Sequence, residues 1–123
     1  MVNYGPGEGD LAEAVRGAAG DARPLLYNGK LGQLMALLKN CCCVVGGDTG
    51  PLHLAIALGT PAVALFGPTN PARNGPYRSQ DIVLRVAGAV RDHSRREETD
   101  ASMLAIQVDA VFEAVRQRLG ASL

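Results

Sequence analysis

The sequence predicts an α/β fold, a Rossmann-like parallel sheet with flanking helices, on three observations. Short apolar segments of strand length alternate with segments in which apolar residues recur at helical spacing. The segments follow one another closely, so one strand reaches the next through a helix, and such crossovers give parallel sheets covered on both faces. The chain has 123 residues, 47% hydrophobic and 20% charged, which fits one globular domain.

The elements follow in order from apolar runs, periodicity and end signals. Short runs of apolar or β-branched residues predict strands at 2–4, 24–27, 41–45, 62–66 and 82–85. Apolar residues three or four positions apart predict helices at 8–19, 31–38, 51–58 and 108–119. Gly20 and Gly59 mark two of the helix ends. The segment 86–101 is dense in charge and has no period, so it is expected to be a solvated loop.

Two of the helices carry an apolar stripe, the pattern of a helix that buries one face. On helix 31–38 the stripe consists of Leu31, Leu34, Met35 and Leu38. On helix 108–119 it consists of Val108, Val111, Phe112, Val115 and Leu119.

Charge and hydropathy exclude several classes of protein. Lys and Arg together number 12, as do Asp and Glu, so a net charge of zero argues against nucleic-acid binding and electrostatic membrane attachment. The apolar stretches are interrupted too often to span a bilayer, and the start of the chain has no signal-peptide pattern. A cytoplasmic location is expected.

The three cysteines, Cys41, Cys42 and Cys43, are adjacent and lead into a predicted strand. We interpret them as small apolar residues of a core strand. The alternative, a metal or redox site, lacks partners, because the only histidines are His53 and His93 and no CxxC spacing occurs. No metal site is expected.

One stretch, 44–53, predicts a binding site for an anion. A strand is followed by two glycines, at 46–47, which are expected to form a tight turn. Asp48 and Thr49 offer helix-capping oxygens, and Pro51 suits the first turn of a helix. Free backbone N–H groups and the positive end of the helix dipole gather at such a loop, where a phosphate or diphosphate can bind.

Individual side chains have both a functional and a structural interpretation. Thr49 offers a hydroxyl donor, and Gly50 lets the main chain approach an anion. His53 can donate to a phosphate oxygen, or it can be a buried core histidine. Asp48 would repel a diphosphate, so it is expected to order backbone N–H groups or contact sugar hydroxyls, unless it is a helix cap alone. Glu8 can accept from ribose hydroxyls or the base, or it can simply favour a helix N-terminus.

The wider motif resembles a known family. The segments DTGPLHLA at 48–55, ALGTP at 57–61 and LFGPTNP at 65–71 resemble the signature of glycosyltransferase family 9, the lipopolysaccharide heptosyltransferases. The segment GPGE at 5–8 resembles a glycine-rich, acidic turn that lies upstream in that family. The agreement is closest from Val44 to Tyr77, about a quarter of the chain.

The resemblance implies the C-terminal half of a GT-B glycosyltransferase, whose second Rossmann-like domain holds the donor nucleotide. It implies transfer of heptose from ADP-heptose to a lipopolysaccharide core acceptor, with no cofactor and no metal. Residues 1–123 would then be a partial nucleotide-sugar-binding domain, inactive alone, with the acceptor-binding N-terminal domain and its catalytic base absent. Peripheral membrane association is expected, if at all, of the full-length enzyme alone. The donor-binding residues that the resemblance implies are Asp48, Thr49, Gly50, Pro51, Leu52, His53 and Glu8.

Further positions border the expected site. Pro68, Thr69 and Arg73 lie on the loop after strand 62–66, and Arg73 fits a surface role equally well. The family often has Asp where Asn70 stands, so that position is not assigned. Ligands bind beyond the carboxyl ends of parallel strands, so the turns at 5–8 and 47–50 are expected at the same sheet edge, forming one site.

Two other functions stay open at the level of sequence. The chain could be a noncatalytic nucleotide-binding or interaction module that reuses this half-fold. A sugar-nucleotide epimerase can share the two-domain fold, but it requires carboxylates and histidines that this segment does not show.

Overall fold

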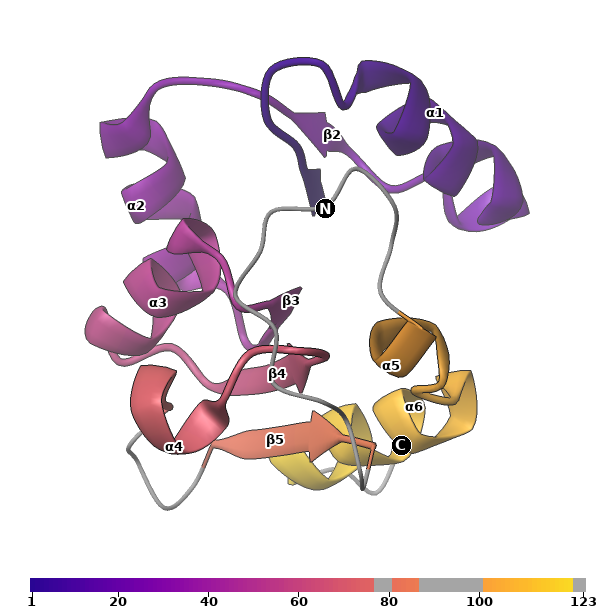
Figure 1. The fold of residues 1–123 in the computed structure, drawn as a ribbon. Helices are drawn as coiled ribbons and strands as arrows, with labels where there is room; N and C mark the ends of the chain where they lie inside the picture. The colour runs from indigo at the N-terminus through magenta and orange to yellow at the C-terminus, as the bar shows by residue number, and fades with distance from the viewer. Residues whose placement is uncertain (77–80, 87–100, 121–123) are drawn as a thin grey trace. The chain divides into compact units, whose positions relative to one another are not determined.

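The computed structural model describes residues 1–76, 81–86 and 101–120, which form two compact units, Met1–Leu34 and Met35–Leu123 (Figure 1). The first unit contains β1 (Val2–Asn3), α1 (Gly9–Ala18), the short 3-10 helix η1 (Gly20–Ala22) and β2 (Leu26–Tyr27). Helix α2 (Leu31–Asn40) begins there. The second unit contains β3 (Val44–Gly47), α3 (Gly50–Ala57), β4 (Ala62–Phe66), α4 (Pro71–Asn74), β5 (Ile82–Arg85), α5 (Ala101–Leu104) and α6 (Val108–Arg118).

The predicted parallel α/β architecture is confirmed. Strands β1 and β2 pair in parallel within the first unit, and β3, β4 and β5 form a parallel three-stranded sheet in the second. Helix α3 connects β3 to β4 and packs against both, while α6 packs against β4 and β5 (Figure 1). The hydrogen bonds thus divide the described strands between two sheets, rather than the one sheet expected from the sequence.

Strand β4 is the centre of the second unit. Its residues Ala62, Val63, Ala64 and Phe66 are each 0% exposed, and because side chains alternate along a strand, both faces of β4 are covered. One face packs with Leu52 of α3, which is 1% exposed. The small alanines let this helix approach the sheet closely, so the loop between β3 and α3 is held on a well-packed base.

Two predictions at the two ends of β3 were wrong. Gly46 and Gly47 belong to the strand and pair with Ala64 and Leu65 of β4, so they form no turn. The strand begins only at Val44, because the pairing with β4 begins there, and this leaves the cysteines outside the ladder. Cys42 is exposed and its two neighbours are partly buried, which corrects the prediction of a cysteine-rich core strand.

The apolar stripes are buried only in part. On α2, Leu34 and Leu38 are buried, at 9% and 3% exposed, whereas Leu31 is exposed. On α6, Val108 and Phe112 are 81% and 57% exposed. The buried residue of α6 is Ala114, which lies outside the predicted stripe, so the predicted stripe matches the covered face only in part.

Three short elements were not predicted from the sequence: η1, α4 and α5. The solvated loop predicted at 86–101 falls mostly on positions 87–100, outside the described residues. Within the described ranges, no helix has the length and apolar character that crossing a membrane requires.

Candidate functional site

The loop 48–49 leaves the carboxyl end of β3 and enters α3. Thr49 is the N-cap residue of the helix, with an extended backbone at φ −136° and ψ 162°. The first N–H groups of a helix have no partner within it. Here they belong to Gly50 and Leu52, because the intervening proline has none and the N–H of His53 donates to the carbonyl of Thr49 at 3.2 Å. These two groups and the helix dipole can attract an anion.

Neither side chain of this loop caps the helix, so the predicted capping role of Asp48 and Thr49 was wrong. The hydroxyl of Thr49 donates to the carbonyl of Gly47, 3.3 Å away, and makes no cap hydrogen bond. The carboxylate of Asp48 is held by other groups. The free N–H groups at the start of α3 are therefore not occupied by the side chain of Asp48 or of Thr49.

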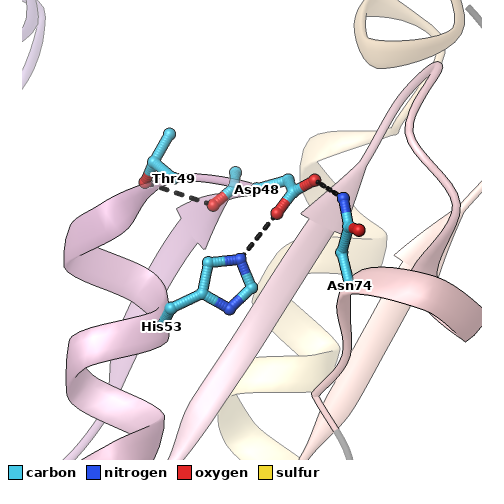
Figure 2. Close-up of polar contacts among 5 residues, drawn as sticks. Asp48, Thr49, His53 and Asn74 are labelled. Atoms are coloured by element: carbon cyan, nitrogen blue, oxygen red, sulfur yellow. Dashed lines mark hydrogen bonds and ion pairs between the residues drawn. The ribbon is translucent and has the colours of Figure 1, made fainter. Parts of the chain in front are cut away.

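The side chain of Asp48 lies between two donors from different elements (Figure 2). Its Oδ1 is 2.6 Å from Nε2 of His53 on α3, and its Oδ2 accepts from Nδ2 of Asn74 on α4, also at 2.6 Å. The side chain is only 13% exposed. Burial raises its pKa, but hydrogen bonds from Asn74, His53 and Thr69, together with the attraction of a protonated His53, lower the pKa below its usual value. Asp48 is therefore a carboxylate acceptor near neutral pH.

An ionised carboxylate can only accept, so Nε2 of His53 carries a proton toward Asp48. The histidine is 41% exposed, which contradicts the alternative of a buried core histidine. Its second ring nitrogen, Nδ1, is then the atom that can meet a ligand. Nδ1 accepts a hydrogen bond when the ring is neutral and donates one when the ring is protonated.

Asn74 is the member of this cluster that the sequence did not reveal. It is the last residue of α4, whose N-cap is Asn70, and Oδ1 of Asn70 accepts from the N–H of Ala72 at 3.0 Å. Thr69, which the sequence placed beside the site, also hydrogen-bonds to Asp48. No local pattern marks Asn74, because its contact with Asp48 joins positions 26 residues apart.

The loop after β4 is packed closely against α5. A Cβ added to Gly67 would lie 3.2 Å from Cβ of Met103 and 3.2 Å from Oγ of Ser102, so this position has little room for a larger residue. The carbonyl of Gly67 also accepts from Nε of Arg85 at the end of β5, at 3.3 Å. The ends of β4 and β5 are therefore tied together on this edge of the sheet.

The remaining predicted residues have distinct environments. The side chain of Leu52 belongs to the core, so only its backbone N–H is available to a ligand. Pro51 stands in the first turn of α3 as predicted. Pro68 is partly buried on the loop after β4, and Arg73 on α4 is exposed and has interactions of its own.

Glu8 lies in the first unit, at the N-cap of α1. Its Oε2 accepts from the N–H of Gly5 at 2.7 Å, so the carboxylate closes its own turn. The structure describes each unit by itself, so the expectation that this turn and the loop 48–49 form one site stays a prediction.

A groove of about 850 Å³ lies in the first unit, between α1, η1 and β2. It contains none of the predicted site residues; its lining includes Glu13, Arg16, Asp21, Arg23 and Leu25. Among the residues that the structure describes, no group of three or more His, Cys, Asp or Glu side chains is arranged to hold a metal ion.

Comparison with known proteins gives one consistent family. Residues 7–104 match the family model of glycosyltransferase family 9 (heptosyltransferase). The chain is 32% identical over 95 residues to lipooligosaccharide heptosyltransferase 2 of Haemophilus ducreyi, an alignment that covers 72% of this chain and 27% of that protein.

Two solved structures resemble the fold. A family 9 glycosyltransferase from Veillonella parvula matches with a TM-score of 0.75 and 29% identity, over 95% of this chain and 35% of that one. The ADP-heptose LPS heptosyltransferase II of Escherichia coli matches with a TM-score of 0.78 and 24% identity, over the same shares, which supports the fold alone. The chain thus spans about a quarter to a third of the length of these relatives.

Proposed function

The chain belongs to glycosyltransferase family 9, and from that membership we propose that it is the donor-binding part of a heptosyltransferase. The donor is a nucleotide sugar, ADP-heptose, and the acceptor is a lipopolysaccharide core. The names of the relatives support this substrate class, and the Escherichia coli neighbour is itself named for ADP-heptose. We propose further that residues 1–123 are a partial nucleotide-sugar-binding domain and that a separate domain binds the acceptor.

The observation that carries the proposal is the Asp48–His53 pair at the N-terminus of α3. It combines backbone donors, the positive end of a helix dipole and a partly exposed imidazole on one loop. These groups suit a diphosphate, whose charge grows as it leaves the sugar during transfer. In its protonated form, His53 donates from Nδ1 to a phosphate oxygen, while Asp48 holds the ring.

Each of the other residues takes a role that its position allows. The N–H groups of Gly50 and Leu52 bind diphosphate oxygens, and the Thr49 hydroxyl joins them by turning away from the carbonyl of Gly47, to which it donates in the ligand-free chain. Pro51 fixes the first turn. Glu8 contacts the ribose or the base, through the carboxylate oxygen that its own turn leaves available. We assign the catalytic base to the acceptor-binding domain.

The test is a calorimetric titration of the chain with ADP, UDP and GDP. We expect selective binding of ADP, weakened about tenfold by His53→Ala, which deletes one hydrogen bond to a charged group. Asp48→Ala is expected to weaken binding by a similar factor, because it releases the ring of His53. The matched control is Asp109→Asn, which removes one exposed acidic charge from α6 and should leave the affinity unchanged.

The outcomes separate the competing functions. Binding of all three nucleotides with equal affinity would favour a general nucleotide-binding module. If a folded sample, with a cooperative unfolding transition, binds none of them, the proposal that this chain holds the donor is wrong. Glu8→Gln tests the ribose contact independently, and an unchanged ADP affinity would remove Glu8 from the site.

A further inference from the structure

A cluster of three side chains connects α4 to the helix that carries His53. Asn74 donates to one oxygen of Asp48, and the other oxygen faces Nε2 of His53, both at 2.6 Å (Figure 2). The order of the contacts is therefore amide, carboxylate, imidazole. Within the part of the chain that the structure describes, the side chain of Asn74 hydrogen-bonds to Asp48 alone, so its influence on His53 passes through that carboxylate.

The position of Asn74 is fixed by its own helix. Its backbone N–H donates to the carbonyl of Asn70 at 3.1 Å, and the helix starts with a side-chain cap and a proline. The N–H of Gly75 donates to the carbonyl of Pro71 at 2.9 Å, which closes the last turn. A short, well-bonded turn thus presents the amide to Asp48.

We propose that Asn74 is a positioning residue, which orients the carboxylate of Asp48 so that His53 keeps its Nε2 proton and presents Nδ1 to the ligand. The carboxylate of Asp48 can rotate about its Cβ–Cγ bond, and of the side chains that hydrogen-bond to it Asn74 has the largest effect on its pKa, ahead of His53 and Thr69. The donor on the second oxygen prevents that rotation, and the first oxygen then stays in line with the imidazole. Asn74 itself touches no ligand in this arrangement.

The last step of this inference, that Nδ1 faces the ligand, rests on the proposed function. The first step does not, since it concerns a hydrogen-bonded cluster in the ligand-free chain. Two measurements separate the steps.

The first measurement is the tautomer of His53, from long-range proton–nitrogen NMR correlations at a pH above the usual titration range of imidazole. The only other histidine, His93, serves as an internal reference. We expect the Nε2–H form alone in the wild type and a mixture of both forms in Asn74→Ala. Asn74→Leu, of nearly the same shape but without the donor, should also give the mixture. An unchanged tautomer in both variants would overturn the inference.

The matched control is Asn40→Ala. Asn40 also donates from Nδ2, to the carbonyl of Ala36 at 2.7 Å, but it stands at the end of α2. This variant loses the same side chain and one hydrogen bond of similar length. A tautomer change in Asn40→Ala as large as that in Asn74→Ala would mean that general destabilisation, rather than the loss of the Asp48 contact, moves the proton.

The second measurement is a double-mutant cycle in ADP affinity. Asn74→Ala should weaken binding about tenfold in the wild-type background and leave it unchanged in the His53→Ala background, because its effect passes through the imidazole. Equal effects in the two backgrounds would overturn the inference. If the wild-type chain binds no ADP, the proposed function fails, while the NMR result still decides the role of Asn74.

Discussion

Replacement of Asp48 by asparagine should change both the stability of the chain and its dependence on pH. In Asp48→Asn the new side chain keeps one oxygen, which can still accept from Asn74. Its amide group then faces Nε2 of His53, which must become the acceptor. Two charge-assisted hydrogen bonds, each at 2.6 Å, are therefore replaced by two neutral ones.

The expected loss follows from the difference between these two kinds of bond. Hydrogen bonds to charged groups contribute about 1.5–3 kcal/mol net and neutral ones about 0.5–1.5 kcal/mol, a difference of about 1 kcal/mol for each bond. The side chain of Asp48 is 13% exposed, but that of His53 is 41% exposed, so solvent screening reduces the contribution of the Asp48–His53 hydrogen bond. We expect Asp48→Asn to lower the free energy of unfolding by about 1.5 kcal/mol near neutral pH.

The sign of the pH dependence follows from the lowered pKa of Asp48. The stabilisation is fully present above the pKa of an unfolded aspartate, about 3.9, and it is lost as the pH falls through the lower pKa of the folded state. The difference between wild type and Asp48→Asn should therefore shrink below about pH 4.

The assay is urea unfolding followed by far-UV circular dichroism at a series of pH values, with the exposed Asp21→Asn as the control. The reasoning is refuted if the stability difference is the same at every pH, or if Asp21→Asn gives the same pH dependence.

Three further predictions concern other parts of the chain. Thr60→Val should cost about 1 kcal/mol in urea unfolding, because the 2.8 Å hydrogen bond to the carbonyl of Leu38 is lost while that carbonyl keeps its bond to Cys41; an unchanged midpoint would contradict this. Arg23→Gly should raise the free energy of unfolding by about 0.5–1 kcal/mol, because Arg23 is in the left-handed region at φ 35°, and a destabilised variant would show that the strain is absent. Phe112→Glu should reduce concentration-dependent association in sedimentation velocity, because Phe112 is 57% exposed on the apolar face of α6, and equal association in both proteins would exclude that face.

Elements with an unambiguous local pattern were predicted closely. Strand β4 is a continuous apolar run between Pro61 and Gly67, and both of its ends agree with the prediction. Strand β5 agrees equally well. Helix α3 begins one residue earlier than expected and ends at Ala57, before Gly59, whose φ of 84° ends the helix as predicted. For β4, β5 and α3, the residue types and the signals at the element ends predict the same bounds, within one residue, as the folded structure has.

The errors arose where pairing or contact over long distance decides the structure. Gly46 and Gly47 have a low strand propensity, yet the ladder with β4 continues through them. On α6 the predicted stripe includes the exposed Val108 and Phe112, while the buried residue is Ala114, because periodicity contains no information about which part of a helix face is covered.

The candidate site was predicted in part for the same reason. The motif placed Asp48, Thr49 and His53 on one strand–helix loop, because those residues are neighbours in sequence. It could not supply Asn74, whose amide contacts Asp48 from α4, 26 residues further along the chain. The same contact explains why the carboxylate of Asp48 does not cap α3: it accepts a hydrogen bond from Asn74 instead.

The bond between Asp48 and Asn74 has a consequence for engineering chimeras from this family. It joins the loop 48–49 to α4, between residues 26 positions apart, so neither segment is an independent module. A recombination boundary placed between β3 and α4 would combine a carboxylate from one parent with whatever the other parent carries at position 74. Hybrids that exchange positions 48–74 as one block should retain the imidazole geometry of their donor parent. Hybrids that exchange α4 alone should retain this geometry only where the incoming sequence also carries a side-chain donor at position 74.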